Sequence, residues 1–298
     1  MSELQIAVVT EESQRKQKIL KEIREELHRI RSYTPKVGVF GDSGVGKSSL
    51  CNALFGRDVA AISDVEACTR QPQEILISNG DAGGLVLVDV PGVGEDPARH
   101  KEYVELYKSL VPNLDLVIWA IKADDRKYLS ALEVYEEVLS PAVSSCPVLF
   151  VITQVDKTNP VRGWDVENHR PGVEQEQNII KKINDISSRF NVSTNKIVPV
   201  AAEESYNLKE VVDKVVDVLP AEKRFSFTRE AKEENVSEAA QQKAEEGVWD
   251  HIKEKFSGVI EYVKEDLLDT VADTVREYGP KVIAYAKVAL VGWLAKRF

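Results

Sequence analysis

Several features are scarce in this sequence, and each scarcity removes a class of protein. Only three of the 298 residues are cysteines, and these lie far apart at Cys51, Cys68 and Cys146. An odd, widely spaced set of this kind has neither the spacing of a zinc site nor the pairing of a disulfide framework. We therefore expect reduced thiols, as in a protein of the cytosol.

Long apolar runs are also missing. No uninterrupted apolar stretch approaches the roughly 18 residues that a membrane-spanning helix needs. The first residues, Met1 to Gln5, lack the basic and apolar regions of a secretory signal peptide. These two absences lead us to expect a soluble, cytoplasmic protein.

Positive charge is in deficit as well. The chain carries 39 Lys and Arg residues against 49 Asp and Glu residues, which gives a formal net charge of -10. An acidic balance disfavours broad, non-specific binding to nucleic acid, although a local basic patch can escape the average. We therefore do not expect nucleic acid as a partner.

One stretch that the sequence does contain organises the rest, namely Gly41-Asp42-Ser43-Gly44-Val45-Gly46-Lys47-Ser48-Ser49. It fits the phosphate-binding loop pattern of a glycine, four residues and then Gly-Lys-Ser. In such a loop, glycines let backbone N–H groups curl around phosphate oxygens. Lys47 places a charge on the terminal phosphates, and the Ser48 hydroxyl can ligate Mg²⁺. An apolar strand pattern at 36–40 and a helical pattern at 49–55 supply the context that this motif requires.

Strand and helix patterns alternate as far as residue 220. Apolar strand patterns occur at residues 36–40, 73–78, 85–90, 115–121, 146–152 and 196–200, and helical patterns at 99–111, 127–139, 174–190 and 206–219. This alternation predicts an α/β fold with a mostly parallel six-stranded sheet covered on both faces. The ligand of such a sheet lies at the carboxyl ends of its strands.

Helical patterns flank this region on both sides. Apolar residues on one face predict an amphipathic helix at 12–33, with Leu20, Ile23, Leu27 and Ile30 on that face. After residue 225 no strand pattern remains. We expect three parts: an N-terminal helix at 1–35, a nucleotide-binding domain at 36–220 and a C-terminal all-helical domain at 225–298.

The last segment, residues 281–298, is apolar on most faces and carries Lys and Arg but no acidic residue. It is too short to span a membrane. A core helix of the C-terminal domain is the favoured interpretation. A membrane-surface or partner helix is the alternative.

Two further motifs end apolar strands. Asp89 is followed by Val90-Pro91-Gly92. Its carboxylate can hold Mg²⁺ through water, and the N–H of Gly92 can reach a terminal phosphate because no side chain blocks the approach. The second motif is Thr153-Gln154-Val155-Asp156.

Together, segments 41–48, 89–92 and 153–156 resemble the Era-like branch of the P-loop GTPases over about residues 36–220. The resemblance implies a Ras-like fold, binding of GTP and GDP with Mg²⁺, and hydrolysis of GTP. The nucleotide contacts that it implies are Asp42, Ser43, Gly44, Val45, Gly46, Lys47, Ser48, Ser49, Asp89, Gly92, Thr153, Gln154, Asp156 and Ala202. The catalytic positions that it implies are Lys47, Thr69 and Gly92, and the metal positions are Ser48, Thr69 and Asp89. By the same resemblance, Thr69 would be the switch threonine, and Ser63 is the alternative hydroxyl in the same loop.

The resemblance also assigns the base. Asp156 would accept two hydrogen bonds from the N1 and N2 donors of guanine, which adenine cannot reproduce, and Ala202 would offer its backbone N–H to the guanine O6. Gln154 stands where the family commonly has a lysine, which leaves guanine specificity expected and the affinity open. Gly44 stands where many relatives have asparagine, so potassium stimulation is not expected.

Val93 follows Gly92, where Ras-like GTPases place a water-orienting glutamine. A valine cannot orient the attacking water, so help must come from the substrate phosphates, a backbone group, Glu95 or Asp96, a partner or a second copy of the chain. We expect a nucleotide-dependent switch with slow intrinsic hydrolysis. Its stimulation would come from a protein partner or from dimerisation, through the switch loops or the helical module.

Two alternatives remain. Helices on both sides of the domain resemble immunity-related and dynamin-like GTPases, which assemble on membranes; residues 281–298 would then be the contact of a peripheral membrane protein. In the other alternative, nucleotide binding is structural and hydrolysis negligible. The Era branch itself suggests RNA partners, but the C-terminal region has neither a strand pattern nor the Gly-x-x-Gly loop of a KH-type appendage.

Overall fold

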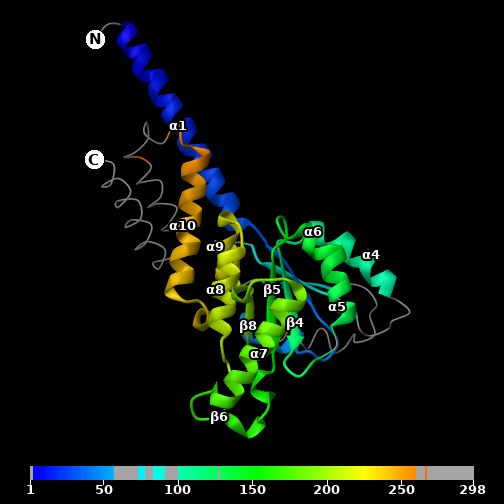
Figure 1. Cartoon of the computed structure of the whole chain (residues 1–298). Helices are drawn as coiled ribbons and strands as arrows, with labels where there is room; N and C mark the ends of the chain where they lie inside the picture. The colour runs from blue at the N-terminus through cyan, green and yellow to red at the C-terminus, as the bar shows by residue number, and fades with distance from the viewer. Residues whose placement is uncertain are drawn as a thin grey trace. The chain divides into compact units, whose positions relative to one another are not determined.

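In a computed structural model of the chain (Figure 1), the residues described are 3–56, 73–77, 83–90, 100–126, 128–259 and 266. Contacts divide the chain into two units. A helical unit comprises Met1–Tyr33, Pro220–Ser226 and Glu238–Phe298, and a sheet unit comprises Thr34–Leu219 and Phe227–Ser237. The two units are not continuous ranges of the chain, because contacts group segments that are distant in sequence. The three continuous domains expected from the sequence stay a prediction.

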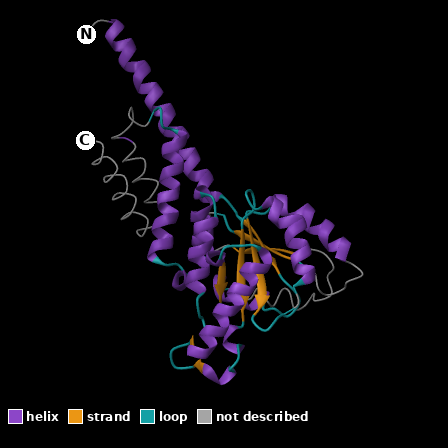
Figure 2. Ribbon diagram, viewed as in Figure 1, coloured by secondary structure: helices purple, strands orange, loops and turns teal. Residues whose placement is uncertain are grey.

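Six strands of the sheet unit form one sheet (Figure 2). They are β1 (Lys36–Phe40), β2 (Gln73–Ile77), β3 (Leu85–Asp89), β4 (Leu116–Lys122), β5 (Val148–Thr153) and β8 (Ile197–Pro199). Their order is β2-β3-β1-β4-β5-β8, and every neighbouring pair is parallel except β2 with β3. The predicted mostly parallel six-stranded sheet is confirmed.

The helices of the sheet unit follow the predicted patterns closely. They are α2 (Lys47–Phe55), α4 (His100–Leu110), α5 (Leu129–Val134), α6 (Ser140–Ala142), α7 (Val173–Phe190) and α8 (Leu208–Val218), with a π-helical turn at Tyr135–Leu139 between α5 and α6. Short 3-10 turns lie at Val111–Asn113, Val155–Lys157, Val161–Gly163, Thr194–Lys196 and Glu233–Asn235. A small hairpin of β6 (Trp164–Asp165) and β7 (Arg170–Pro171) was not predicted.

The core of the sheet unit is built on β4 and β5. Trp119 and Phe150 are register partners on these strands, and their rings stack at 6.2 Å. Phe190 of α7 lies 5.0 Å from Phe150. Because all three are buried, each contributes about 2 to 3 kcal/mol of apolar burial to the free energy of folding. This core fixes the strands whose carboxyl ends carry the site.

The end of α9 (Ala221–Glu230) and the residues that follow it also belong to the sheet unit, from Phe227 to Ser237. The rings of Phe227 and Phe55 lie 5.9 Å apart, edge to face. The N–H of Lys232 donates to the carbonyl of Leu54 at 2.9 Å. These contacts cap the end of α2 and explain why residues 227–237 are grouped with the sheet.

The helical unit joins the two ends of the described chain. α1 (Glu3–Ser32) runs beside α10 (Glu238–Lys255) in Figure 1, with an apolar seam between them. The seam consists of Ile19, Ile23, Leu27 and Ile30 of α1 and Trp249, Ile252 and Phe256 of the α10 region. The amphipathic helix is confirmed, but Leu20 is only half-buried and Ile19 takes its place, because steps of four, four and three residues keep one face.

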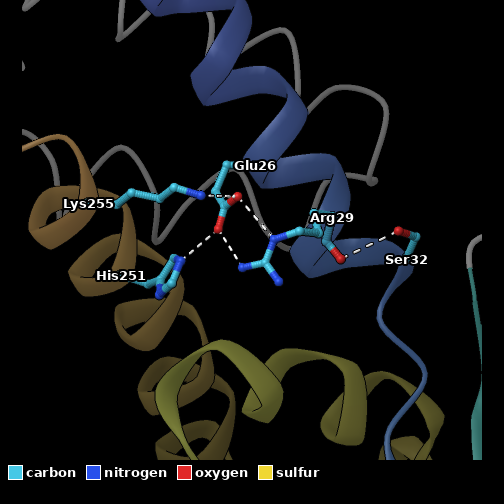
Figure 3. A network of polar contacts seen from close by, with 5 residues as sticks. All are labelled: Glu26, Arg29, Ser32, His251 and Lys255. Atoms are coloured by element: carbon cyan, nitrogen blue, oxygen red, sulfur yellow. Dashed lines mark hydrogen bonds and ion pairs between the residues drawn. The ribbon is translucent and has the colours of Figure 1, made fainter.

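One carboxylate of this unit is bonded to an arginine, a lysine and a histidine side chain (Figure 3). Glu26 of α1 is 5% exposed and accepts hydrogen bonds from Arg29 Nη2 at 2.5 Å, His251 Nε2 at 2.7 Å and Lys255 Nζ at 2.6 Å. Arg29 first, then Lys255 and His251, hold the pKa of this carboxyl well below its usual range, although burial opposes them. The contacts tie α10 to α1.

Candidate nucleotide-binding site

The predicted phosphate loop lies between β1 and α2. Gly41 has φ +139°, and a Cβ there would lie 2.4 Å from the carbonyl oxygen of Ala120 on β4. A side chain would therefore collide with backbone. Gly46 has φ +91° and precedes the first turn of α2, which has no side-chain cap hydrogen bond and no acidic residue. The positive end of this helix is thus left to an external anion.

Lys47 reaches back across this loop. Its Nζ donates to the carbonyl oxygens of Gly41 at 2.9 Å and Asp42 at 3.2 Å. The ammonium group is therefore held on the loop that the first turn of α2 faces. A fixed cation beside a helix N-terminus is the arrangement that suits phosphate oxygens.

Two residues with side-chain oxygens are neighbours of this loop, Ser48 in the sequence and Asp89 through the pairing of β3 with β1. Ser48 follows Lys47 and is half-buried. Asp89 ends β3 in register with Val39 of β1, two residues before the loop begins. Hydroxyl and carboxylate oxygens are the ligands that Mg²⁺ prefers, so these residues fit that ion. Among the described residues, no cluster of three or more His, Cys, Asp or Glu could hold a metal.

The second motif is bonded to the phosphate loop. Thr153 ends β5 and is buried, and its Oγ1 donates to the carbonyl of Val45 at 2.5 Å. Gln154 has φ 56°, and its Nε2 lies 3.4 Å from the carbonyl oxygen of Gly44. Segments that are more than a hundred residues apart in sequence therefore meet at the carboxyl edge of the sheet.

Asp156 lies in the turn Val155–Lys157, directly after this contact. The N–H of Val155 donates to the carbonyl of Val200 at 3.2 Å, which joins this turn to the end of β8. Burial raises the pKa of the Asp156 carboxyl, and the nearby Glu203 and Glu204 add to that rise. Hydrogen bonds that a ligand donates to a carboxylate in such a place stabilise its charged form.

Ala202 lies in the turn that follows β8. The N–H of Tyr206 donates to the carbonyl of Ala201 at 3.0 Å and closes this turn. Through the Val155–Val200 bond, the structure brings the Ala202 turn to the same edge as Asp156. The roles of these residues in binding stay a prediction.

Gln175 was missed by the sequence analysis. It lies on the third residue of α7, is fully buried and donates from Nε2 to the carbonyls of Asp156 at 3.3 Å and Thr158 at 2.9 Å. The available signal was a glycine, Gly172, followed three residues later by a glutamine, since this spacing is typical of a capping pair at a helix start. The side chain's reach to another turn had no signal in the sequence.

The remaining predicted positions lie outside the described residues. They are Ser63, Thr69, Gly92, Val93, Glu95, Asp96 and the segment 281–298, and of Asp89 only the backbone is described. In the part of the chain that the structure describes, no helix is both long and apolar enough to cross a membrane.

Comparison with known proteins places the chain among GTPases. The profile of a family described as 50S ribosome-binding GTPase matches residues 36–154. The uncharacterized protein YkfA of Escherichia coli K12 is 39% identical over 198 residues, which are 66% of this chain and 67% of YkfA. GTPase Era of Clostridium botulinum strain Alaska E43 is 27% identical over 185 residues, which are 62% of this chain and 55% of Era.

A solved structure of Era in complex with MgGDPNP and a segment of 16S ribosomal RNA is 25% identical, with a TM-score of 0.47. The match covers 63% of this chain and 57% of that chain. The chain thus spans little more than half the length of these two Era proteins.

Proposed function

This chain belongs to the Era-like family of P-loop GTPases, and we propose that it acts as a guanine-nucleotide switch. In this proposal it binds GTP and GDP with Mg²⁺ and hydrolyses GTP to GDP and phosphate. Membership of the family supports nucleotide binding and hydrolysis. The switch behaviour and its regulation are inferred from the residues of this chain.

The observation that carries the proposal is the junction between the two loops. The Thr153 hydroxyl and the Gln154 amide both bond to the phosphate loop, at Val45 and Gly44. These bonds therefore fix the position of the phosphate loop relative to the segment that carries the Asp156 carboxylate. A mononucleotide is a ligand that needs both at once.

The base-reading group in this proposal is Asp156. Its carboxylate accepts the N1 and 2-amino donors of guanine, whereas adenine offers no donor at either place. The Ala202 N–H contributes a bond to the guanine O6. Burial of Asp156 makes an unpaired state costly, which strengthens the discrimination between bases.

The phosphate end in this proposal uses Lys47, the backbone N–H groups of the loop and the first turn of α2. The Ser48 hydroxyl and Asp89 would hold Mg²⁺, together with Thr69. When bound, Mg²⁺ neutralises charge that develops on the phosphate oxygens. Gly92 would contact the terminal phosphate with its N–H and so report its presence to the chain.

We further propose that hydrolysis by the isolated chain is slow. Val93 has no group that can orient a water molecule. Stimulation would then come from a protein partner or from a second copy of the chain. A nucleotide-binding protein with negligible hydrolysis is the competing outcome, and the same experiment distinguishes the two.

The test is phosphate release with GTP and with ATP over a range of protein concentrations. The wild type is compared with Lys47→Ala, with Lys36→Ala as a control because the Lys36 side chain pairs with Glu74 at 2.8 Å on the surface, away from the loop. We expect slow GTP turnover that Lys47→Ala abolishes and Lys36→Ala retains. A rate per molecule that rises with protein concentration supports stimulation by a second copy of the chain, and a slow rate that does not rise supports stimulation by another protein. Turnover equal in wild type and Lys47→Ala, or a preference for ATP, contradicts the proposal. A fast rate that is independent of concentration contradicts its regulatory part.

A further inference from the structure

Gln175 uses all of its side-chain amide hydrogens on one turn of the chain. Both N–H groups of Nε2 point at carbonyls, those of Asp156 at 3.3 Å and Thr158 at 2.9 Å. Its Oε1 accepts from the N–H of Gly172 at 3.3 Å. The side chain is completely buried, so these bonds are made without competing water, and the loss of a donor would leave buried carbonyls unpaired.

The surroundings of Gln175 leave this side chain little freedom. The N–H of Gly172 donates to the carbonyl of Gly163 at 3.0 Å, and a Cβ at Gly172 would lie 2.4 Å from that oxygen. A Cβ at Gly163 would lie 3.4 Å from Cγ of Gln175. Two close-packed glycine segments therefore confine the amide to the position from which it reaches the Asp156 turn.

The turn that Gln175 holds carries the base-reading carboxylate of the proposed function. The other anchors of this turn lie before Asp156: Thr153 bonds to the phosphate loop, and the N–H of Val155 bonds to Val200. Gln175 holds Asp156 itself and Thr158, because its amide donates to the carbonyl of each. A hydrogen-bonding group must be held within about 0.5 Å of its working place to discriminate between ligands.

We propose that Gln175 is a positioning residue that sets the selectivity of this site for the 2-amino group of guanine. This inference rests on the proposed function, because it assumes that Asp156 reads the base. Gln175 does not touch the nucleotide; it acts through the backbone of Asp156. Without Gln175, the Asp156 carboxylate keeps its charge but is no longer held where it can accept from the 2-amino group of guanine.

A general role in folding would produce a different result from a role in positioning. A loosened fold weakens the binding of every nucleotide by a similar factor. A misplaced Asp156 weakens the binding of GTP more than that of ITP, because the hypoxanthine base of ITP has the N1 donor but no 2-amino group. The triphosphate is the same in both. The ratio of the two affinities is therefore the informative measurement.

The experiment measures dissociation constants for GTP and ITP by displacement of a fluorescent GTP analogue from the full chain. The test variant is Gln175→Met, which keeps the side-chain volume and removes the amide. The matched control is Asn178→Leu, one turn along α7. The Asn178 amide also donates to a loop carbonyl, that of Asn159 at 2.8 Å, but this bond is exposed to solvent and lies beyond the Asp156 turn. Asp156→Ala tests the base-reading role independently.

We expect Gln175→Met to lower the ratio of GTP to ITP affinity by about tenfold, and Asn178→Leu to leave it unchanged. Asp156→Ala should bring the ratio close to one. Equal losses for both nucleotides in Gln175→Met, or no loss, overturn the inference while the Asp156→Ala result still supports the proposed function. A ratio that survives in Asp156→Ala contradicts the proposed function and this inference with it. Should Gln175→Met fail to fold, Gln175→Asn keeps a polar amide but is one methylene shorter, so that it cannot reach the Asp156 and Thr158 carbonyls, and it must show the same fall in ratio.

Discussion

The hydroxyl of Thr153 donates a hydrogen bond of 2.5 Å to the carbonyl oxygen of Val45. This bond joins the last residue of β5 to the middle of the phosphate loop. Both residues are buried, so the bond is sheltered from water. It makes the phosphate end and the base end of the site one rigid piece.

Thr153→Val removes this bond and keeps the shape of the side chain. We expect a loss of about 1 to 3 kcal/mol in the free energy of unfolding, because the buried Val45 carbonyl loses a donor. We also expect weaker GTP binding. Thr194→Val is the control, since Thr194 is an exposed threonine at the start of a short turn. Chemical denaturation together with nucleotide titration checks the prediction, and equal effects of both variants would contradict it.

Two glycines of the phosphate loop should respond differently to the same change. Gly41→Ala places a methyl group 2.4 Å from the Ala120 carbonyl at φ +139°, whereas Gly44→Ala, at φ +74°, meets no atom within 4 Å. We expect Gly44→Ala to cost about 1 kcal/mol of backbone strain and Gly41→Ala to cost several-fold more. Thermal unfolding of both variants decides, and a similar cost for the two would show that the close approach to β4 is wrong.

Glu26→Gln should loosen the contact of α1 with α10. Removal of the charge leaves Arg29, His251 and Lys255 without their shared carboxylate. We expect a loss of about 2 kcal/mol at neutral pH, less than for a sealed ion pair because the cationic partners are partly exposed. Asp250→Asn is the control, since its pair with Lys253 at 2.7 Å lies on the surface of α10.

The effect of Glu26→Gln should also depend on pH. The folded chain lowers the pKa of Glu26, so the stabilisation is fully present above the pKa of an unfolded glutamate, about 4.3. It is lost as the pH falls through the lower folded value. Urea unfolding from about pH 7 down to about pH 3 should show the two proteins converging; a difference that is constant over this range would contradict the assignment.

Binding of GTP should weaken on acidification. The pKa of Asp156 is raised by burial, so its carboxylate begins to protonate at a higher pH than an ordinary aspartate, whose pKa is about 3.9. The protonated group accepts fewer hydrogen bonds from guanine. Dissociation constants measured from about pH 8 to about pH 4.5 should rise for the wild type and less for Asp156→Asn. A flat profile for the wild type would contradict this reading of Asp156.

The sequence was sufficient for the features that have a strong local signal. The phosphate loop follows a fixed pattern of residues, and the buried runs of β4 and β5 have almost no polar interruption. Boundaries were less accurate where single residues decide them. β5 begins at Val148, later than predicted, since Pro147 has no N–H for the sheet. α8 begins at Leu208, since Asn207 has φ 59°.

The features of the fold and of the site that the sequence did not predict depend on very short elements or on contacts between separate segments of the chain. The strands of the β6–β7 hairpin are two residues long, too short to show a period. The bonds from Thr153 to Val45 and from Gln175 to the Asp156 turn span 108 and 19 residues. A sequence pattern shows which residue types occupy such positions, but it does not show which carbonyl each side chain contacts.

The most direct test of the central claim exchanges the base that Asp156 reads. Affinities for GTP and for xanthosine triphosphate are measured in the wild type and in Asp156→Asn, because asparagine offers an N–H to the 2-oxo group of xanthine where aspartate accepts from the 2-amino group of guanine. We predict that the wild type prefers GTP and that Asp156→Asn prefers xanthosine triphosphate, each by at least about tenfold. If Asp156→Asn folds and keeps the preference of the wild type, the account of this chain as a guanine-nucleotide protein that reads its base through Asp156 is contradicted.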